Sequence, residues 1–436
     1  MGVTRIVPIK AADGGPFQGP FPPLKEAAEP LKKIQWYRCP MPKGALGELM
    51  QRSDAKGLFQ CAGHFSIWLT TAACVHRCWS AGLYALLPLA MFAHGTVGST
   101  LVYGCHELGH GERRSSSFPR FSSISPPLLR HFTQFSLELS GTMFKTKALN
   151  SFFLYLYSVL FWWDPIDYAA SHTYHHRYSQ YPEADRENLF PLEPTLDKWV
   201  MLRLFTVNLD SGPGRVFGKG GMFSTIRLTC KAAMGGVASE EGAESYEWLK
   251  AVHADQPEEW TKSMYFSQGI VAFHLAVLCY SVYTAQPVLV FIVSLHSFFC
   301  SWYSYFVGSC QHCGLKSSTP DFRKNTRSIT LDPFSEFLFF HMNWHIEHHM
   351  FAAVPCYNLK KCHQVTKDYM PEPRSLVGAW KDMREIWHRQ QLDPSFEFDT
   401  QVNGGPSQGA SSLVTEDIGG SIGDLAPAGL TDKKVR

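Results

Sequence analysis

The stretches His172-Thr173-Tyr174-His175-His176 and His345-Ile346-Glu347-His348-His349 repeat one pattern of histidines. In a helix, the histidines three residues apart face one side, and the adjacent last histidine turns toward a second site. Bridging two metal ions requires such an arrangement. Imidazole nitrogens suit iron, zinc and copper, whereas magnesium and calcium prefer oxygen ligands. The repeated pattern therefore predicts a site for two transition-metal ions.

A third cluster, His106-Glu107-Leu108-Gly109-His110, lies directly after an apolar run. If the helix of that run continues, its two imidazoles lie on one face, four residues apart, which suits one metal ion. Such a pair alone would also fit surface or helix-capping histidines. Of the 19 histidines in the chain, however, eight fall in these three clusters. Unrelated structural histidines do not explain the set.

Two apolar hairpins accompany the clusters. The first covers about residues 57–75, turns at residues 76–78 and returns over residues 82–105; the second covers residues 264–283, turns at residues 286–287 and returns over residues 288–310. Each arm has close to the ~20 residues that a helix needs to cross the hydrocarbon core of a bilayer. We therefore expect an all-α integral membrane protein with four transmembrane helices in two hairpins and a cytoplasmic helical cap that carries the histidines.

The distribution of positive charge predicts the orientation. Between the hairpins lie Arg113, Arg114, Lys145, Lys147, Arg177 and Lys198, whereas the first turn holds only His76 and Arg77. Because positively charged segments stay on the cytoplasmic side, we expect this connection and both termini in the cytoplasm. In a eukaryote the membrane would be that of the endoplasmic reticulum.

The chain divides into four expected parts. Residues 1–56 form an aqueous cytoplasmic leader, residues 57–370 the catalytic membrane domain, residues 371–402 a cytoplasmic segment, and residues 403–436 a Gly- and Ser-rich disordered tail. Within the domain, residues 152–163 are too short to span and predict an interfacial or re-entrant helix. Residues 198–205 predict a helix that lies flat on the membrane or an amphipathic helix that is buried.

Composition narrows the class of protein. The formal net charge is only +2, from 40 basic and 38 acidic residues, so no broad electrostatic surface for nucleic acid is expected. Charged residues make up 18% of the chain, against roughly 25% in soluble domains, which favours a partly lipid-embedded protein. The 12 cysteines follow no regular spacing and predict buried, reduced thiols.

The three histidine clusters resemble the histidine boxes of the membrane fatty acid desaturase and hydroxylase superfamily, which read HxxxH, HxxHH and HxxHH. Their order and spacing, the long gap before the third box and the positions of the hairpins fit from about Gly57 to Asp368. The resemblance implies two iron ions that bind and split dioxygen. It implies that the ligands are the eight box histidines, His106, His110, His172, His175, His176, His345, His348 and His349.

A ninth ligand is suggested by Gln311-His312-Cys313-Gly314-Leu315, which follows the fourth arm and resembles an extra histidine segment of this superfamily and of the related alkane hydroxylases. The alternative for His312 is a polar residue at a helix end. Around the ligands we consider Asn343, which would reach the centre directly or through water as in some acyl-CoA desaturases, or would simply cap a helix. Second-sphere carboxylates should fix the imidazole tautomers, and the candidates nearest in sequence are Glu107, Glu347 and Asp185, each of which could equally be a solvated charge.

The remaining histidines of the spanning arms have no neighbour at ligand spacing, and we expect neutral, hydrogen-bonded helix contacts. They are His64, His76, His94, His274 and His296. His341 is the strongest exception, because it shares a helix face with His345, four residues away.

The implied chemistry removes hydrogen from an unactivated C–H bond. Two successive abstractions give an alkene, whereas abstraction followed by oxygen rebound gives an alcohol. The leading hypothesis is an oxygen-dependent desaturase of a fatty acyl lipid; the alternative is a hydroxylase, epoxidase or ketolase of an apolar terpenoid, polyketide or carotenoid. No flavin or nicotinamide glycine motif follows a strand, and Gly212, Gly214, Gly218, Gly220 and Gly221 predict a flexible loop. Electrons should therefore come from an external NAD(P)H reductase through a cytochrome or ferredoxin.

Two other classes of protein remain as alternatives. A metal transporter should carry a path of ionisable residues near the middle of the bilayer, and the arms lack a ladder of Asp or Glu. A zinc hydrolase needs roughly three protein ligands and an open water position, which nine imidazoles exceed. Metal content discriminates these classes.

Overall fold

The computed structural model describes residues 24–113, 139–185, 187, 193–210, 220–241 and 243–402. Residues 1–23 of the leader, the tail after residue 402, Arg114, and Gly212, Gly214 and Gly218 of the predicted loop lie outside these residues. Helices dominate the described chain, and its strands form one antiparallel pair, β1 (Gly111–Arg113) with β2 (Leu139–Gly141), and one parallel pair, β3 (Ile329–Thr330) with β4 (Arg374–Ser375). The predicted helical class is confirmed.

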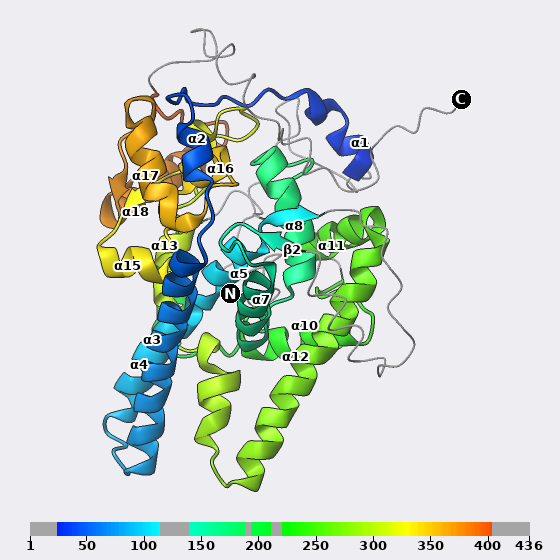
Figure 1. Cartoon of the computed structure of the whole chain (residues 1–436), viewed down its shortest axis with the longest axis vertical. Helices are drawn as coiled ribbons and strands as arrows, with labels where there is room; N and C mark the ends of the chain where they lie inside the picture. Colours follow the sequence, from blue (N-terminus) through cyan, green and yellow to red (C-terminus); the bar gives the residue numbers. More distant parts are fainter. Residues whose placement is uncertain are drawn as a thin grey trace.

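Two hairpins project from the same end of the molecule (Figure 1). In the first, α3 (Asp54–Ser80) is capped at its N-terminus by Ser53, whose hydroxyl accepts from the amide of Lys56. The chain then returns through α4 (Leu87–Ser99) and α5 (Leu101–Gly109). The predicted turn at residues 76–78 is wrong, because these residues remain helical. The helix ends where Gly82 adopts a left-handed φ of 69° and Leu83 donates to the carbonyl of Cys78, the hydrogen bond that closes a Schellman cap.

The second hairpin has an interrupted return arm. After α12 (Pro257–Tyr283), the chain turns at residues 284–287 and continues as a π-helical turn η2 (Val290–Ser294), a 3₁₀ turn η3 (His296–Phe298) and α13 (Trp302–Ser309). The expected continuous helix over residues 288–310 is therefore wrong. At the break the Cys300 amide donates to Thr206, and the Asn208 amide donates to Phe298. The segment after α9 thus satisfies the backbone groups that the missing helix would have paired.

Two helices, α3 and α12, are long and apolar enough to cross a membrane. The return arms consist of shorter elements, so the four predicted crossings are not all matched by single long helices. The far ends of both hairpins expose large apolar side chains, including Leu89 at 68%, Val282 at 72% and Tyr283 at 88% exposure. Apolar surface of this kind is costly in water and is typical of a surface that contacts lipid.

Helix α9 (Lys198–Phe205) forms over the predicted residues, and its N-terminus is capped by Asp197. None of its residues is buried, so the interpretation as a buried helix is wrong. Trp199 and Leu202 are 62% and 51% exposed, whereas Phe205 stacks on Trp302 of α13. The helix therefore keeps the apolar outer face expected of the membrane-surface alternative.

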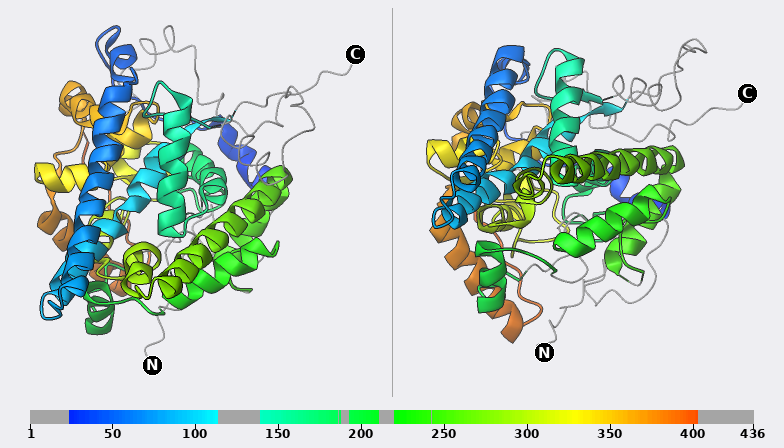
Figure 2. Two further views of the ribbon diagram at one scale, coloured as in Figure 1. Left: turned by 60° about the horizontal axis from the view of Figure 1, so that its bottom comes forward. Right: turned by 90° about the horizontal axis from the view of Figure 1, so that it is seen from below.

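A helical cap lies beyond the hairpins, opposite their tips (Figures 1 and 2). Its elements are α1 (Leu24–Ala28), η1 (Pro30–Lys33), α2 (Ala45–Leu49), α7 (Lys147–Phe161), α8 (Pro165–Tyr178), α11 (Glu244–Asp255), α14 (Phe322–Asn325), α15 (Pro333–Leu338), α16 (His345–Met350), α17 (Cys356–Thr366), η4 (Lys367–Tyr369) and α18 (Leu376–Leu392). Helix α10 (Met222–Ala233) instead packs along α12 of the second hairpin.

Helix α7 locks α5, which carries the first histidine cluster, into the core. A Cβ atom at Gly104 of α5 would lie 2.3 Å from the ring of Tyr157, so only glycine permits this approach. The Tyr157 hydroxyl also donates to Cys61 of α3, and the Asn150 side chain donates to the carbonyl of Leu108 near the end of α5. These contacts fix the position from which α5 presents His106.

Candidate metal centre

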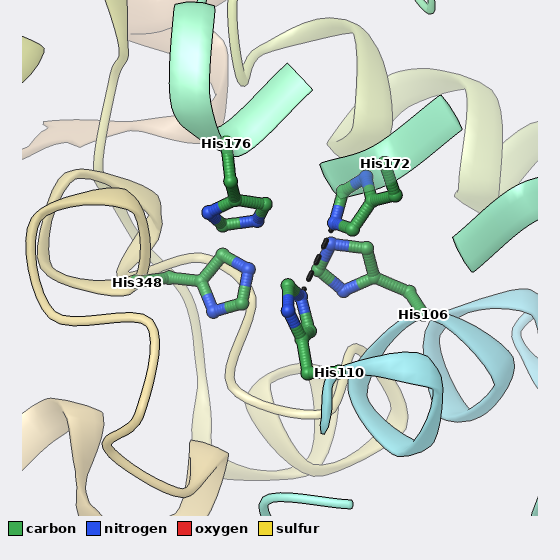
Figure 3. Close-up of side chains that lie close together, drawn as sticks. All are labelled: His106, His110, His172, His176 and His348. Carbon is green, nitrogen blue, oxygen red and sulfur yellow. Dashed lines mark hydrogen bonds between the residues drawn. The ribbon is translucent and has the colours of Figure 1, made fainter. Parts of the chain in front are cut away.

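The nine predicted histidines come together in two groups. One, the five-histidine cluster, comprises His106, His110, His172, His176 and His348; the other, the four-histidine cluster, comprises His175, His312, His345 and His349. Within each group one ring nitrogen of every histidine lies within 4.8 Å of the others. Figure 3 shows the rings of the first group converging on one point. The groups adjoin, since the rings of His176 and His349 stack at 4.3 Å between centroids.

The division within the HxxHH boxes differs from the expected one. His172 shares its cluster with His176, four residues on, while the middle histidine, His175, belongs to the other cluster, and His345, His349 and His348 repeat this division. The reason is helical geometry, because 3.6 residues per turn place position i+4 about 40° from position i and position i+3 about 60° away on the opposite side. Adjacent histidines diverge by about 100°, so each box serves both clusters.

The first box departs from a continuous helix. Helix α5 ends at Gly109, and His110 has an extended backbone with φ −67° and ψ 128°. Its ring nevertheless stays near His106, with 5.0 Å between ring centroids. The expected helical continuation through both histidines is wrong, but the two imidazoles still reach one cluster.

Hydrogen bonds on the outer side of the clusters fix several ring tautomers. His172 Nδ1 lies 2.9 Å from both carboxylate oxygens of Glu187, and His175 Nδ1 lies 2.9 Å from Asp185. His312 Nδ1 lies 3.0 Å from the carbonyl of Asn325. The Asp185 carboxylate and the Asn325 carbonyl are acceptors, so His175 and His312 carry a proton on Nδ1 and direct Nε2 toward a metal ion. Burial raises the pKa of Glu187 to about 8, and the ionised form of Glu187 fixes His172 in the same way.

Ser179 fixes the tautomer of a fourth ring, that of His349. Its single hydroxyl proton is donated to the carbonyl of His175 at 2.6 Å. The Ser179 oxygen, 2.9 Å from His349 Nδ1, must therefore accept from that nitrogen. The Nε2 atom of His349 consequently carries a lone pair, as it does in His312.

The convergence of these lone pairs tests whether a metal ion fits. His345 Nε2 lies 3.1 Å from Nε2 of His312 and 3.1 Å from Nε2 of His349, and His172 Nε2 lies 3.1 Å from His110 Nε2. A proton on His345 Nε2 could form a good hydrogen bond to only one of these two nitrogens. Two nitrogens bound to one ion at about 2.1 Å, roughly 95° apart, would be separated by about 3.1 Å.

The surroundings of several ring nitrogens also indicate that metal ions fit the clusters. Both ring nitrogens of His176 and of His348, and Nδ1 of His106, are buried without a hydrogen-bond partner among the residues that the structure describes. A buried polar atom without a partner costs roughly 1–3 kcal/mol. Metal ions in the clusters would give these rings the partner that the protein does not provide.

Burial keeps nearly all of the rings neutral. It lowers the pKa of His110 and His312 to about 3 and lowers the pKa values of His106, His172, His176, His345, His348 and His349 well below their usual range. His175 differs, because burial lowers its pKa but Asp185 and Glu187 outweigh this effect and raise it to about 9. Neutral imidazole is the form that binds metal ions, so an ion at His175 would displace the second proton that this ring otherwise holds on Nε2.

The four proposed second-sphere residues have different surroundings. Asp185 contacts His175 directly. Glu107 binds Thr142 and the Cys356 amide, with one oxygen 4.0 Å from His348 Nδ1.

Glu347 and Asn343, the other two proposed residues, contact side chains and backbone outside the two clusters. Glu347 accepts from Ser328 and lies 2.6 Å from His363, and Asn343 donates to Ile329 and Glu336. All four are buried, so the interpretation of the three carboxylates as solvated charges is wrong.

Sequence reasoning missed Glu187, Ser179 and Asn325. Glu187 stands two residues after Asp185, and that spacing was the available signal. The contact of Ser179 depends on the end of α8, where the serine follows the helix and meets α16. The Asn325 contact uses a backbone carbonyl, which has no sequence signature.

The solitary histidines behave mainly as expected. His64 contacts Thr100, His94 contacts Thr71 and the carbonyl of Ile292, and His274 contacts Ser294 and Val159. His296 is buried beside Trp68, whereas His76 is exposed. His341 joins neither cluster.

Comparison with known proteins gives one match. A family model described as fatty acid desaturase matches residues 138–379, which include the second and third boxes and His312 but not His106 or His110. A search of curated proteins finds no match.

Proposed function

The chain belongs to the fatty acid desaturase family, and from this premise we propose that it is an oxygen-dependent membrane oxidase that introduces a double bond into a lipid acyl chain at a di-iron centre. The observation that carries the proposal is the pair of adjoining all-histidine clusters, which together bring nine imidazoles to the site. This donor set differs from the carboxylate-rich sites of soluble di-iron bundles.

In the proposed site the five-histidine cluster holds one iron ion and the four-histidine cluster holds the other. Bound iron would supply the activation of dioxygen. The overall reaction converts CH2–CH2 to CH=CH, consumes one O2, two external electrons and two protons, and releases two water molecules.

The protein's own contribution is to orient and desolvate the ligands. Glu187, Asp185 and Ser179 hold Nδ1 of His172, His175 and His349, so that Nε2 of each ring faces the centre. Outer-sphere contacts of this kind set both the orientation and the basicity of a metal-bound imidazole. Burial of the rings excludes the water that would otherwise compete for the iron.

An apolar substrate follows from the surroundings of the site. The histidine-bearing cap adjoins two hairpins whose exposed side chains are apolar (Figure 1). In our proposal the hairpins make four membrane crossings, with the cap and both termini on the cytoplasmic side. The electrons come from an external carrier and its NAD(P)H reductase.

The test compares oxygen-dependent lipid profiles, measured by mass spectrometry in a host that supplies a reductase. We expect a product that lacks two hydrogens in the wild type, and a loss of at least about 100-fold with His348→Ala, because removal of a ligand disables the metal site. His341→Ala is the matched control, since this histidine lies outside both clusters, and should retain activity. Turnover by His348→Ala at the wild-type rate would contradict the metal assignment, and a product that gains one oxygen would identify a hydroxylase or epoxidase.

A further inference from the structure

Two rings in contact, those of Trp344 and His363, connect the third histidine box to the surface of the cap. Trp344 is buried and directly precedes His345 in the chain. Its ring lies 4.4 Å, between centroids, from the ring of His363 on α17. The His363 side chain is 15% exposed. A path therefore leads from solvent through the contacting rings of His363 and Trp344 to the backbone of His345, a metal-site histidine.

Buried carboxylates hold both rings in place. Trp344 Nε1 donates to Glu336 at 3.1 Å, and His363 Nδ1 lies 2.6 Å from Glu347. The second oxygen of Glu347 accepts from Ser328 at 2.7 Å. Glu347 thus orients the path to the surface, and this role explains why a carboxylate within the third box points away from the metal centre.

The surface around His363 is basic. Lys360, Lys361 and Lys367 are exposed on α17 and η4, with one exposed carboxylate, Asp368, beside Lys367, and Lys56 lies over the ring of the neighbouring Tyr357. Lys360 pairs with Glu336 at 3.0 Å, yet its side chain is 52% exposed. For a chain whose net charge is only +2, this is a local concentration of positive charge, and it lies at the end of the molecule opposite the hairpin tips (Figure 1).

We infer that the basic face of α17 is the docking surface for an acidic one-electron carrier, and that electrons enter through His363 and Trp344. The inference rests on the proposed function, which requires two external electrons per turnover. Each docking event oxidises one carrier molecule by one electron and reduces the metal centre by one. Two successive events supply the pair that one O2 requires. Complementary charge accelerates and orients such transient encounters.

A second aromatic path offers an internal comparison. Trp36 stacks on Phe322 at 4.1 Å, and Phe322 lies 5.6 Å from His349. The exposed lysines earlier in that segment are Lys32 and Lys33, and Lys32 is engaged by Glu29. We favour α17, because Trp344 is joined to a metal-site histidine by a peptide bond.

The binding test uses full-length protein in nanodiscs and two probes, an acidic b-type cytochrome and an acidic plant-type ferredoxin. Exchanging two lysines in Lys361→Glu/Lys367→Glu should weaken binding of the functional probe about tenfold or more at low salt and reduce its salt dependence. Lys32→Glu/Lys33→Glu makes the same change in charge elsewhere and should bind like the wild type. Equal binding by both variants, or selective loss with the Lys32/Lys33 variant, would overturn the inference.

The path itself is tested by stopped-flow oxidation of the reduced carrier at saturating concentration. His363→Ala removes the ring and should slow electron transfer severalfold, whereas His363→Phe keeps a ring and should restore most of the rate. Equal rates for the wild type and His363→Ala would exclude this route. A wild-type protein that contains no iron would instead refute the proposed function, while the binding comparison would still report on the docking surface.

Discussion

At the scale of single residues, the spacing of the histidines determines which of the two clusters each one joins. The sequence identified all nine imidazoles of the two clusters. It did not predict their division, since the i, i+3 pairing seemed the natural one and the structure pairs i with i+4. Nor could it predict Asn325, whose carbonyl meets His312 only because α14 lies beside the cluster.

Asp185 provides a prediction at this scale. Asp185→Leu keeps the approximate size of the side chain but removes the acceptor for His175 Nδ1, and iron affinity should fall about 10–100-fold, as for other outer-sphere losses. Asp185→Asn retains one acceptor oxygen, so its loss of iron affinity should be smaller. Iron retention during dialysis against a graded chelator measures the effect. Identical retention by Asp185→Leu and the wild type would show that this contact does not support the ligand.

At the scale of elements, long apolar helices were predictable and their interruptions were not. The predicted bounds of α9 and the predicted end of α12 hold, because a capping residue starts α9 and an apolar pattern runs to the end of α12. The predicted start of α12 at residue 264 is wrong, since the helix already begins at Pro257, in a polar stretch without an apolar signal. The break near Cys300 has no such signal, since its backbone partners are Thr206 and Asn208, about 90 residues earlier in the chain. Tertiary hydrogen bonds therefore decide the shape of this arm.

The close packing of α5 on α7 gives a prediction for an element. In Gly104→Ala the new methyl group would meet the Tyr157 ring at 2.3 Å, and such overpacking should cost about 1–3 kcal/mol. The protein should therefore unfold at a lower temperature and lose iron as His106 shifts. Gly47→Ala in α2 is the matched control, because its Cβ meets nothing within 4 Å. Equal melting temperatures for the two variants in nanodiscs would refute the packing argument.

At the scale of the whole molecule, the fold places a helical cap against two projecting hairpins (Figures 1 and 2), and the exposed side chains at the hairpin tips are apolar. Three boxes far apart in sequence meet only because α5, α8 and α16 converge in the core. The sequence motifs predicted this convergence through their resemblance to a family. Composition alone predicted the membrane-like character but not the chemistry, because apolar runs contain no information about the metal.

Metal analysis of the purified wild-type protein shows whether the two clusters hold two iron ions. Because imidazole also suits zinc and copper, iron, zinc and copper are quantified together by mass spectrometry, and Mössbauer spectroscopy reports whether the irons are coupled. We predict about two irons per chain, coupled to each other, and less than half that content in both His348→Ala and His349→Ala. A single zinc ion per chain, or iron content unchanged in both variants, would contradict the account.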